Sequence, residues 1–341
     1  SKYWYDRGGF KSKVISKIKT GQVHFKYNGD AENLEKFIND NKHRLIEATD
    51  RITKKMRERG GGISDIKLIN KSAELKSYYQ LHIDFKTIDS MGANFINSCL
   101  EIISKKFHQL LNDSLHFKES EKKIEVIMSI LSNYTPECIV ESSLECEIGD
   151  LGDIDGMSSE EFAHRFKDAF DIADIDINRA VTHNKGIMNG VDAVLISTGN
   201  DFRAVEAGVH AFASSKGKYK SLSNCSIIDN IFKISLKIPL SIGTVGGITD
   251  VHPMVKLSLK LLNNPTSDEL MNIICCVGLA QNFAAVKSLV TSGIQKGHMK
   301  MHLINLLIKQ NASKDQIDKS EEYFRDKDIN NQSVKDFLNQ N

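Results

Sequence analysis

The sequence lacks several features that mark particular classes of protein. It has no uninterrupted apolar run of roughly 18–20 residues, the length that a membrane-spanning helix needs, and no signal-peptide pattern. Its six cysteines include no C-x-x-C pair, which argues against a disulfide framework and favours a reducing cytoplasm. The formal net charge is only +1, so bulk charge indicates no polyanionic partner such as nucleic acid.

Two phosphate-binding fingerprints are also absent. The sequence contains neither G-x-G-x-x-G nor G-x-x-x-x-G-K-[ST], so a classical Rossmann or P-loop site is not predicted. His298 and His302 are spaced to share one helix face, but no H-E-x-x-H glutamate or third ligand accompanies them, and no metal site is predicted. The length of 341 residues, with 40% hydrophobic and 26% charged residues, is ordinary for a soluble protein of two domains.

Periodicity in the first part of the chain predicts strands and helices. Apolar and polar side chains alternate in 23–27 and in 81–85, which predicts two strands. A charged helical segment is expected from about residue 32 to 59, ending at three glycines. After the second strand, apolar residues recur at helical spacing from Ile96 to Phe107. The polar turn that opens this helix is either an ordinary connection or a place where free N–H groups receive a phosphate.

The second half of the chain is predicted to contain elements of both kinds. Strands are expected at 123–133, 192–197 and 232–242, and helices at 159–173, at 202–212 and from Thr266 towards Gly293. The last strand alternates strictly, and Pro239 within it favours a sheet edge or a bend. Thr266 begins a T-x-x-E capping box. From about residue 309 the chain is polar and charged, which is typical of a solvated terminal subdomain.

The stretch from Arg179 to Asp201 contains the densest group of reactive side chains. Two glycines lie among polar residues in 179–190, which we interpret as a loop where the backbone can approach a ligand. Lys185 would place a fixed cation near a developing oxyanion, although a lone lysine is more often a solvated surface residue. Asp201 is as compatible with a helix N-cap as with catalysis. Local chemistry therefore indicates a site without naming its reaction.

Six motifs occur in a specific order along the chain. They are D-S-M-G-A-N at 89–94, T-H-N-K-G-I-M-N-G at 182–190, T-G-N-D at 198–201, G-T-V-G-G at 243–247, Q-N at 281–282 and G-H-M at 297–299. Together they resemble the class II 3-hydroxy-3-methylglutaryl-coenzyme A (HMG-CoA) reductases, and the resemblance extends over nearly the whole chain. It implies the reduction of HMG-CoA to mevalonate and free coenzyme A, with two molecules of NADH or NADPH consumed.

The resemblance also implies an architecture. The expected fold is α/β (α+β), with a large acyl-CoA-binding domain, an inserted small non-Rossmann NAD(P)-binding domain and a C-terminal helical flap. The divisions expected are residues 1–20 and 131–292 for the large domain, 21–130 for the small domain and 293–341 for the flap. A homodimer or higher homo-oligomer is implied, with active sites at subunit interfaces, HMG-CoA as substrate, and no nucleic-acid or membrane partner.

Residue roles follow from the resemblance position by position. Lys185 matches the catalytic lysine, whose ammonium stabilises negative charge on the thioester oxygen and later on the aldehyde oxygen. Asp201 matches the aspartate that hydrogen-bonds to this lysine and tunes it. His298 matches the flap histidine that protonates the departing coenzyme A thiolate. Arg179 matches the arginine that holds the substrate carboxylate.

Further matches concern the substrate pocket and the cofactor. Asn189 and Asn133 match polar residues that line the substrate and nicotinamide pocket. Asp50 lies where an acidic residue would accept the ribose 2′-OH of NADH, but the basic residues 51, 54 and 55 beside it favour NADPH, so the choice stays open. The cofactor loop that the resemblance implies consists of Asp89, Met91, Gly92, Ala93 and Asn94.

One departure from the family pattern concerns the N-terminal side. The family's Glu-Glu-Pro-Ser type motif, whose glutamate donates a proton during carbonyl reduction, has no counterpart here, and the chain opens on Ser1 rather than Met. We expect the natural protein to carry that segment upstream. A non-catalytic acyl-CoA or dinucleotide-binding protein is the alternative if it does not, although intact Lys185, Asp201 and His298 argue against it. A second alternative is the same enzyme oxidising mevalonate, because one site catalyses both directions.

Overall fold

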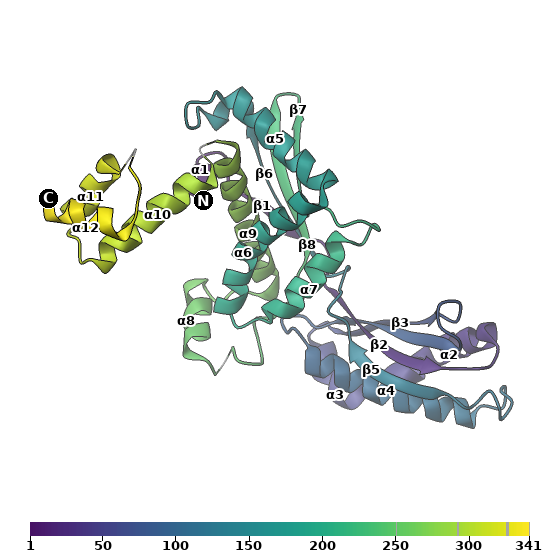
Figure 1. The fold of residues 1–341 in the computed structure, drawn as a ribbon. Coiled ribbons are helices and arrows are strands. Elements are labelled where there is room, and N and C mark those ends of the chain that lie inside the picture. Colours follow the sequence, from purple (N-terminus) through teal and green to yellow (C-terminus); the bar gives the residue numbers. More distant parts are fainter. Residues whose placement is uncertain (250, 292, 325–326, 341) are drawn as a thin grey trace.

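The computed structural model describes residues 1–249, 251–291, 293–324 and 327–340, with only the backbone described for 294–300 and 321. Two four-stranded sheets organise it: the first sheet has the order β3-β4-β2-β5 and the second sheet has the order β1-β6-β8-β7 (Figure 1). Every strand pair in both sheets is antiparallel. The mixed α/β fold class expected from the sequence is confirmed, with antiparallel sheets in both parts.

The first sheet and its helices form a unit at the lower right of Figure 1. Alternation in β2 turns Val23 and Phe25 inward, where they are fully buried against α4 residues such as Leu100. The expected single helix over 32–59 is two helices, because the chain breaks at Ala48–Thr49. The elements are β2 (Ile18–Lys26), α2 (Ala31–Glu47), α3 (Asp50–Glu58), β3 (Gly62–Asn70), β4 (Tyr78–Lys86), α4 (Ala93–Asp113) and β5 (Glu125–Leu131).

The second sheet packs against the long helices α5, α6 and α9. Its core contains buried side chains from the strands and from α5, α6 and α9. The elements are α1 (Lys2–Tyr5), β1 (Lys11–Val14), β6 (Ile139–Glu147), the 3-10 helix η1 (Ile148–Leu151), α5 (Ser159–Ile175), α6 (Ile177–Ser197), α7 (Phe202–Ala213), β7 (Ser223–Ile228), β8 (Ile231–Pro239), α8 (Pro253–Leu261) and α9 (Ser267–Val290).

Helices α6 and α9 cross unusually closely. A Cβ atom added at Gly190 of α6 would lie 2.9 Å from the carbonyl oxygen of Val277, and one added at Gly278 of α9 would lie 2.9 Å from Val191. Glycine at these two positions lets the helix backbones approach each other. The C-terminal helices α10 (Ile294–Lys309), α11 (Lys314–Tyr323) and α12 (Asn331–Gln340) have a separate small core and lie at the left of Figure 1.

Three sequence expectations need correction in this part. Residues 192–197 are not a strand, and 179–190 are not a loop, because both belong to α6. A short apolar run does not distinguish a strand from a buried helix segment, and here Val191 and Leu195 are buried one helical turn apart. Strand β8 is central rather than at an edge, and Pro239 is its last residue, where a missing N–H costs little.

Helix α9 corrects the expectation that no segment is apolar enough to cross a membrane. By length and composition alone it is the one helix in the described ranges that qualifies, with a mean hydropathy of 1.7. Its buried face includes Leu270, Ile274 and Leu279, which belong to the core of the second sheet. Packing in a domain core accounts for its apolar character. The same helix begins at the predicted capping box, in which Thr266 and Glu269 bond reciprocally.

Candidate active site

Three loops from distant parts of the sequence enclose a hollow of about 890 Å³. Residues 90–95 come from the turn between β4 and α4, residues 199–203 join α6 to α7, and residues 243–249 follow β8. The hollow therefore brings three of the six sequence motifs together. Its volume is in the range of pockets that hold a small molecule or cofactor.

Hydrogen bonds join the loop after β8 to both of the other loops. The amide of Thr244 donates to the carbonyl of Asp89 at 2.8 Å, and the amide of Gly243 donates to the side-chain oxygen of Asn200 at 2.9 Å. A Cβ atom at Gly243 would lie 2.4 Å from the nitrogen of Met91. No side chain fits at that contact, which explains a glycine at this position.

The start of α4 faces the hollow with free backbone donors. Gly92 is the N-cap, with a φ of 85° and no side-chain cap hydrogen bond, and residues 92–95 line the hollow. The first amides of a helix carry partial positive charge and have no partner within the helix. Met91, Gly92, Ala93 and Asn94, all predicted cofactor residues, lie here together. This end of the hollow is suited to an anionic group such as a phosphate.

Asp89 differs from the rest of the predicted cofactor loop. Its carboxylate accepts from the backbone N–H of Ser267 at 2.9 Å, at the first turn of α9. Asp89 does not line the hollow. In this structure it fastens the loop to α9, which is a structural role that its sequence position did not reveal.

Asp201 lines the hollow and also caps a helix. Its carboxylate accepts from the amide of Ala204 at 3.1 Å at the start of α7, which confirms the N-cap interpretation. The side chain remains 45% exposed, and Arg203 approaches it at 3.9 Å. One carboxylate oxygen can therefore hold the helix while the other faces a ligand.

Lys185 lies on an exposed face of α6. Thr182, Lys185 and Asn189 recur at three and four residues, all exposed, so their side chains share one side of the helix. No carboxylate lies within ion-pair distance of Lys185 in the described part of the chain. A catalytic ammonium would thus have its partner outside this single chain.

Lys185 and Asp201 cannot meet within one chain. Lys185 precedes Ser197, the last residue of α6, by 12 residues, which is about 18 Å at a rise of roughly 1.5 Å per residue. Asp201 follows the end of that helix, beyond the turn at 198–200. A lysine side chain is too short to span this distance. If the two groups act together, they come from two copies of the chain.

Beneath the exposed face, α6 is anchored by a buried polar cluster. His183 Nε2 lies 2.6 Å from the Ser223 hydroxyl and 3.1 Å from the Asn282 amide nitrogen, and Ser223 donates to Asn282 at 2.9 Å. Burial, followed by the nearby charge of Arg179, lowers the pKa of His183 to about 3. The ring is therefore neutral at physiological pH. This buried cluster is a structural support, not an exposed nucleophile and base.

Comparison with known proteins agrees with these motifs. The family model for hydroxymethylglutaryl-coenzyme A reductase matches residues 1–303. The 3-hydroxy-3-methylglutaryl-coenzyme A reductase of Archaeoglobus fulgidus is 32% identical over 317 residues, which cover 92% of this chain and 68% of the relative. This chain belongs to the hydroxymethylglutaryl-coenzyme A reductase family.

Further relatives of the reductase family include solved structures. A probable reductase of Borreliella burgdorferi is 36% identical over 254 residues, covering 74% of this chain and 55% of the relative. A reductase from Streptococcus pneumoniae has a TM-score of 0.78 and 34% identity, covering all of this chain and 78% of the other. A class II reductase from the same organism, bound to NADPH in open conformations, has a TM-score of 0.77 and 35% identity, covering 85% of this chain and 76% of the other.

Three further residues that the reductase resemblance singled out do not line the hollow: Asn133, Arg179 and Asn189. Asn133 is exposed, and its carbonyl lies against Gly208 of α7, the helix that Asp201 caps. Arg179 is half-buried near the start of α6, where burial lowers its pKa. Asn189 is exposed beside Lys185. His298 belongs to α10, and its side chain lies outside the described residues.

Asp50, which was predicted as a cofactor residue, pairs with a residue outside the hollow. Its carboxylate pairs with Arg57 at 3.0 Å on the exposed side of α3, and it does not line the hollow. A residue that sequence reasoning missed is Lys19, which is buried beside the loop at 87–91. The alternation of the strand could have identified it, because Lys19 lies an even number of residues from the inward-facing Val23 and Phe25.

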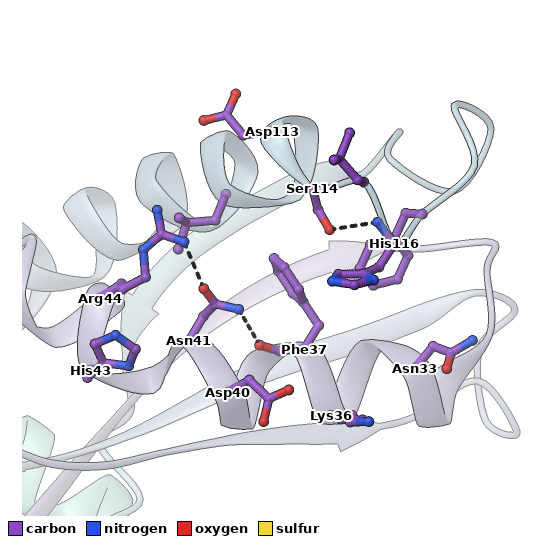
Figure 2. Close-up of a pocket in the computed structure, with 13 residues that line it drawn as sticks. Asn33, Lys36, Phe37, Asp40, Asn41, His43, Arg44, Asp113, Ser114 and His116 are labelled. Carbon is purple, nitrogen blue, oxygen red and sulfur yellow. Dashed lines mark hydrogen bonds between the residues drawn. The ribbon is translucent and has the colours of Figure 1, made fainter.

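A second hollow, of about 750 Å³, lies in the smaller sheet unit between α2 and the end of α4 (Figure 2). Asn41 connects its polar lining, donating to the Phe37 carbonyl at 2.9 Å and accepting from Arg44 at 3.1 Å. None of the six motifs contributes a residue to it. The chemistry of this family therefore points to the three-loop hollow instead.

Proposed function

We propose that this chain forms the catalytic part of an NAD(P)H-dependent HMG-CoA reductase, with the nicotinamide cofactor in the three-loop hollow. The observation that carries the proposal is the convergence of the cofactor loop, the T-G-N-D turn and the glycine loop on one hollow. The free amides at the start of α4 suit the cofactor's phosphates. We further propose a homodimer and a cytoplasmic location.

The proposed chemistry assigns each step to a side chain. When bound, NAD(P)H supplies the two hydrides. Lys185 stabilises the oxyanion that forms when the thioester carbonyl receives the first hydride. The C–S bond then breaks, and His298 gives a proton to the coenzyme A thiolate. The aldehyde receives the second hydride beside Lys185, and its oxygen takes up the proton that the glutamate of the family's Glu-Glu-Pro-Ser type motif would donate, which gives mevalonate. Asp201 holds Lys185 charged and correctly placed.

The placement of Lys185 supports a site shared between two copies. Its exposed helix face and its separation of about 18 Å from the end of α6 leave the Asp201 carboxylate out of reach within one chain. A two-fold dimer brings the same surface of both copies together, so each lysine can reach the other copy's hollow. Arg179 and Asn189, on the same helix, would then approach the substrate from the lysine's side.

A steady-state assay of the full-length protein tests the proposal. We expect HMG-CoA-dependent oxidation of NADPH or NADH, and a loss of kcat of about 100-fold or more in Lys185→Ala, because an oxyanion-stabilising charge is removed. Lys233→Ala is the matched control, because Lys233 is a surface lysine paired with Glu145 on the second sheet. Turnover in Lys185→Ala equal to that of the control would contradict the mechanism. Dinucleotide binding without turnover in the wild type would instead favour the binding-protein alternative.

A further inference from the structure

Lys19 is a buried lysine at the junction of the two sheet units. It is only 4% exposed, and four oxygens lie within hydrogen-bonding distance of its ammonium, which has three N–H donors to share among them. These are the Thr87 hydroxyl at 2.8 Å and the carbonyls of Ser90 at 2.7 Å, Met91 at 3.0 Å and Ile242 at 3.2 Å. No carboxylate pairs with it in the described ranges. A buried charge satisfied only by neutral oxygens is costly and calls for an explanation.

The four oxygens belong to two walls of the hollow. Thr87, Ser90 and Met91 lie in the turn between β4 and α4, whereas Ile242 precedes the glycine loop after β8. The Thr87 hydroxyl donates to the Ser90 carbonyl at 2.6 Å, so it must accept from Lys19. The ammonium thus bridges the cofactor loop to the other sheet unit. The carbonyls of Ser90 and Met91 accept from Lys19, so the backbone of the turn is held at two successive residues.

We propose that Lys19 is a positioning residue for dinucleotide binding, which fixes the 87–92 turn against the 242–247 loop so that the start of α4 points into the hollow. The inference rests on the dinucleotide site proposed above. Lys19 acts on the dinucleotide only by holding the turn in place, because Lys19 itself does not line the hollow. Without its donors, three carbonyls and a hydroxyl would lose a partner, and the turn would relax towards water.

The protonation of Lys19 supports this role. Burial lowers its pKa to about 8. The charged groups and thiols that face it are Cys138, which raises its pKa, and Lys17 just before the same strand, which lowers it. An ammonium donates three hydrogen bonds, whereas a neutral amine donates two. We therefore expect dinucleotide affinity to weaken as pH rises through about 8, and this dependence to disappear when Lys19 is replaced.

Fluorescence titration of the full-length protein with NADPH, and separately with NADH, tests the inference. Lys19→Met keeps the length of the side chain and removes its donors, and we expect the Kd to rise about tenfold. The KM for HMG-CoA should stay within about twofold, because the turn lies on the dinucleotide side. Lys26→Met is the matched control: Lys26 is an exposed lysine at the far end of the same strand, its ammonium pairs with Glu125 rather than with the turn, and the Kd should not change.

The outcomes separate this inference from the proposed function. A wild-type protein that binds neither dinucleotide refutes the proposed site itself. A wild type that binds, with a folded Lys19→Met variant of equal Kd and unchanged pH profile, overturns the role of Lys19 alone. If Lys19→Met does not fold, Thr87→Val tests the inference in its place. That variant removes the hydroxyl that accepts from Lys19 and donates to the Ser90 carbonyl. A Kd increase of about threefold is then expected, and an unchanged Kd overturns the inference.

Discussion

Subunit mixing tests the claim that Lys185 and Asp201 act in one site but come from different chains. Lys185→Ala and Asp201→Ala dimers should each be nearly inactive, because every site lacks one of the two groups. After random reassortment, half of the dimers contain one subunit of each kind. In such a dimer one site lacks both groups and the other is intact, so the mixture should recover about one quarter of wild-type activity. The distance of about 18 Å along α6 excludes recovery by any shift within one chain.

The assay needs proof that subunits exchange. Differently tagged variants are mixed and incubated under conditions that dissociate the dimer. Tandem purification then isolates the mixed dimers, in which one of two sites is intact, so their NADPH oxidation should reach about half of wild-type activity. A mixture of Lys185→Ala with the Lys185→Ala/Asp201→Ala double variant is the matched control, since no combination in it restores a complete site. Purified mixed dimers as inactive as this control would refute the shared site, and with it our interpretation of the exposed face of α6.

Two further predictions concern stability and the double role of Asp201. The folded-state pKa of His183, about 3, lies below its unfolded value, so stability should fall as pH decreases from about 6.5 towards 3. The free energy of unfolding, measured in urea at a series of pH values, should change less steeply with pH in His183→Asn than in the wild type, by up to about 1.4 kcal/mol per pH unit. Equal pH dependence of the two proteins would refute the neutral buried ring. Asp201→Asn keeps an N-cap acceptor and should cost little stability while lowering kcat about 100-fold or more. Asp201→Ala should lower kcat to a similar extent and also lower the free energy of unfolding by about 1 kcal/mol, because it removes the N-cap acceptor. Equal stability of the two variants would contradict the capping role of Asp201.

Strand alternation was the most reliable sequence signal. The strict pattern of 232–242 and the pattern of 23–27 both correspond to strands, β8 and β2, because one face of each sheet is buried. The wrong predictions of a loop and a strand within α6 have an identifiable cause. Asn184, Gly186 and Gly190 are poor helix formers, and local preference indicates a loop. In the fold, Gly190 permits the close crossing with α9, and Asn184 bonds to the backbone of Lys220 and Leu222. Tertiary contacts outweigh the local preference.

The candidate site was accessible from sequence only through resemblance. Its loops follow β4, α6 and β8, more than a hundred residues apart from first to last, and no periodicity indicates that they converge. Lys19 is the instructive omission. A lysine in phase with buried residues of a strand predicts a buried cation, and a buried cation predicts a cluster of oxygens around it. The partners could not be named from sequence, because Ser90 and Ile242 approach it through the fold.

Helix α6 explains how an exposed lysine can still be placed accurately. Its outer face carries Lys185, and its inner face carries His183, whose ring is held between Ser223 and Asn282 and packs edge-on against Phe170 at 4.8 Å. Catalytic groups must be held by neighbours that are themselves fixed. The close crossing at Gly190 adds backbone contact with α9. The helix therefore cannot rotate without breaking a buried polar cluster, so the direction of Lys185 is set before a second copy arrives. In the proposed dimer, the second copy would have to supply only the facing hollow, not the order of the lysine's own helix.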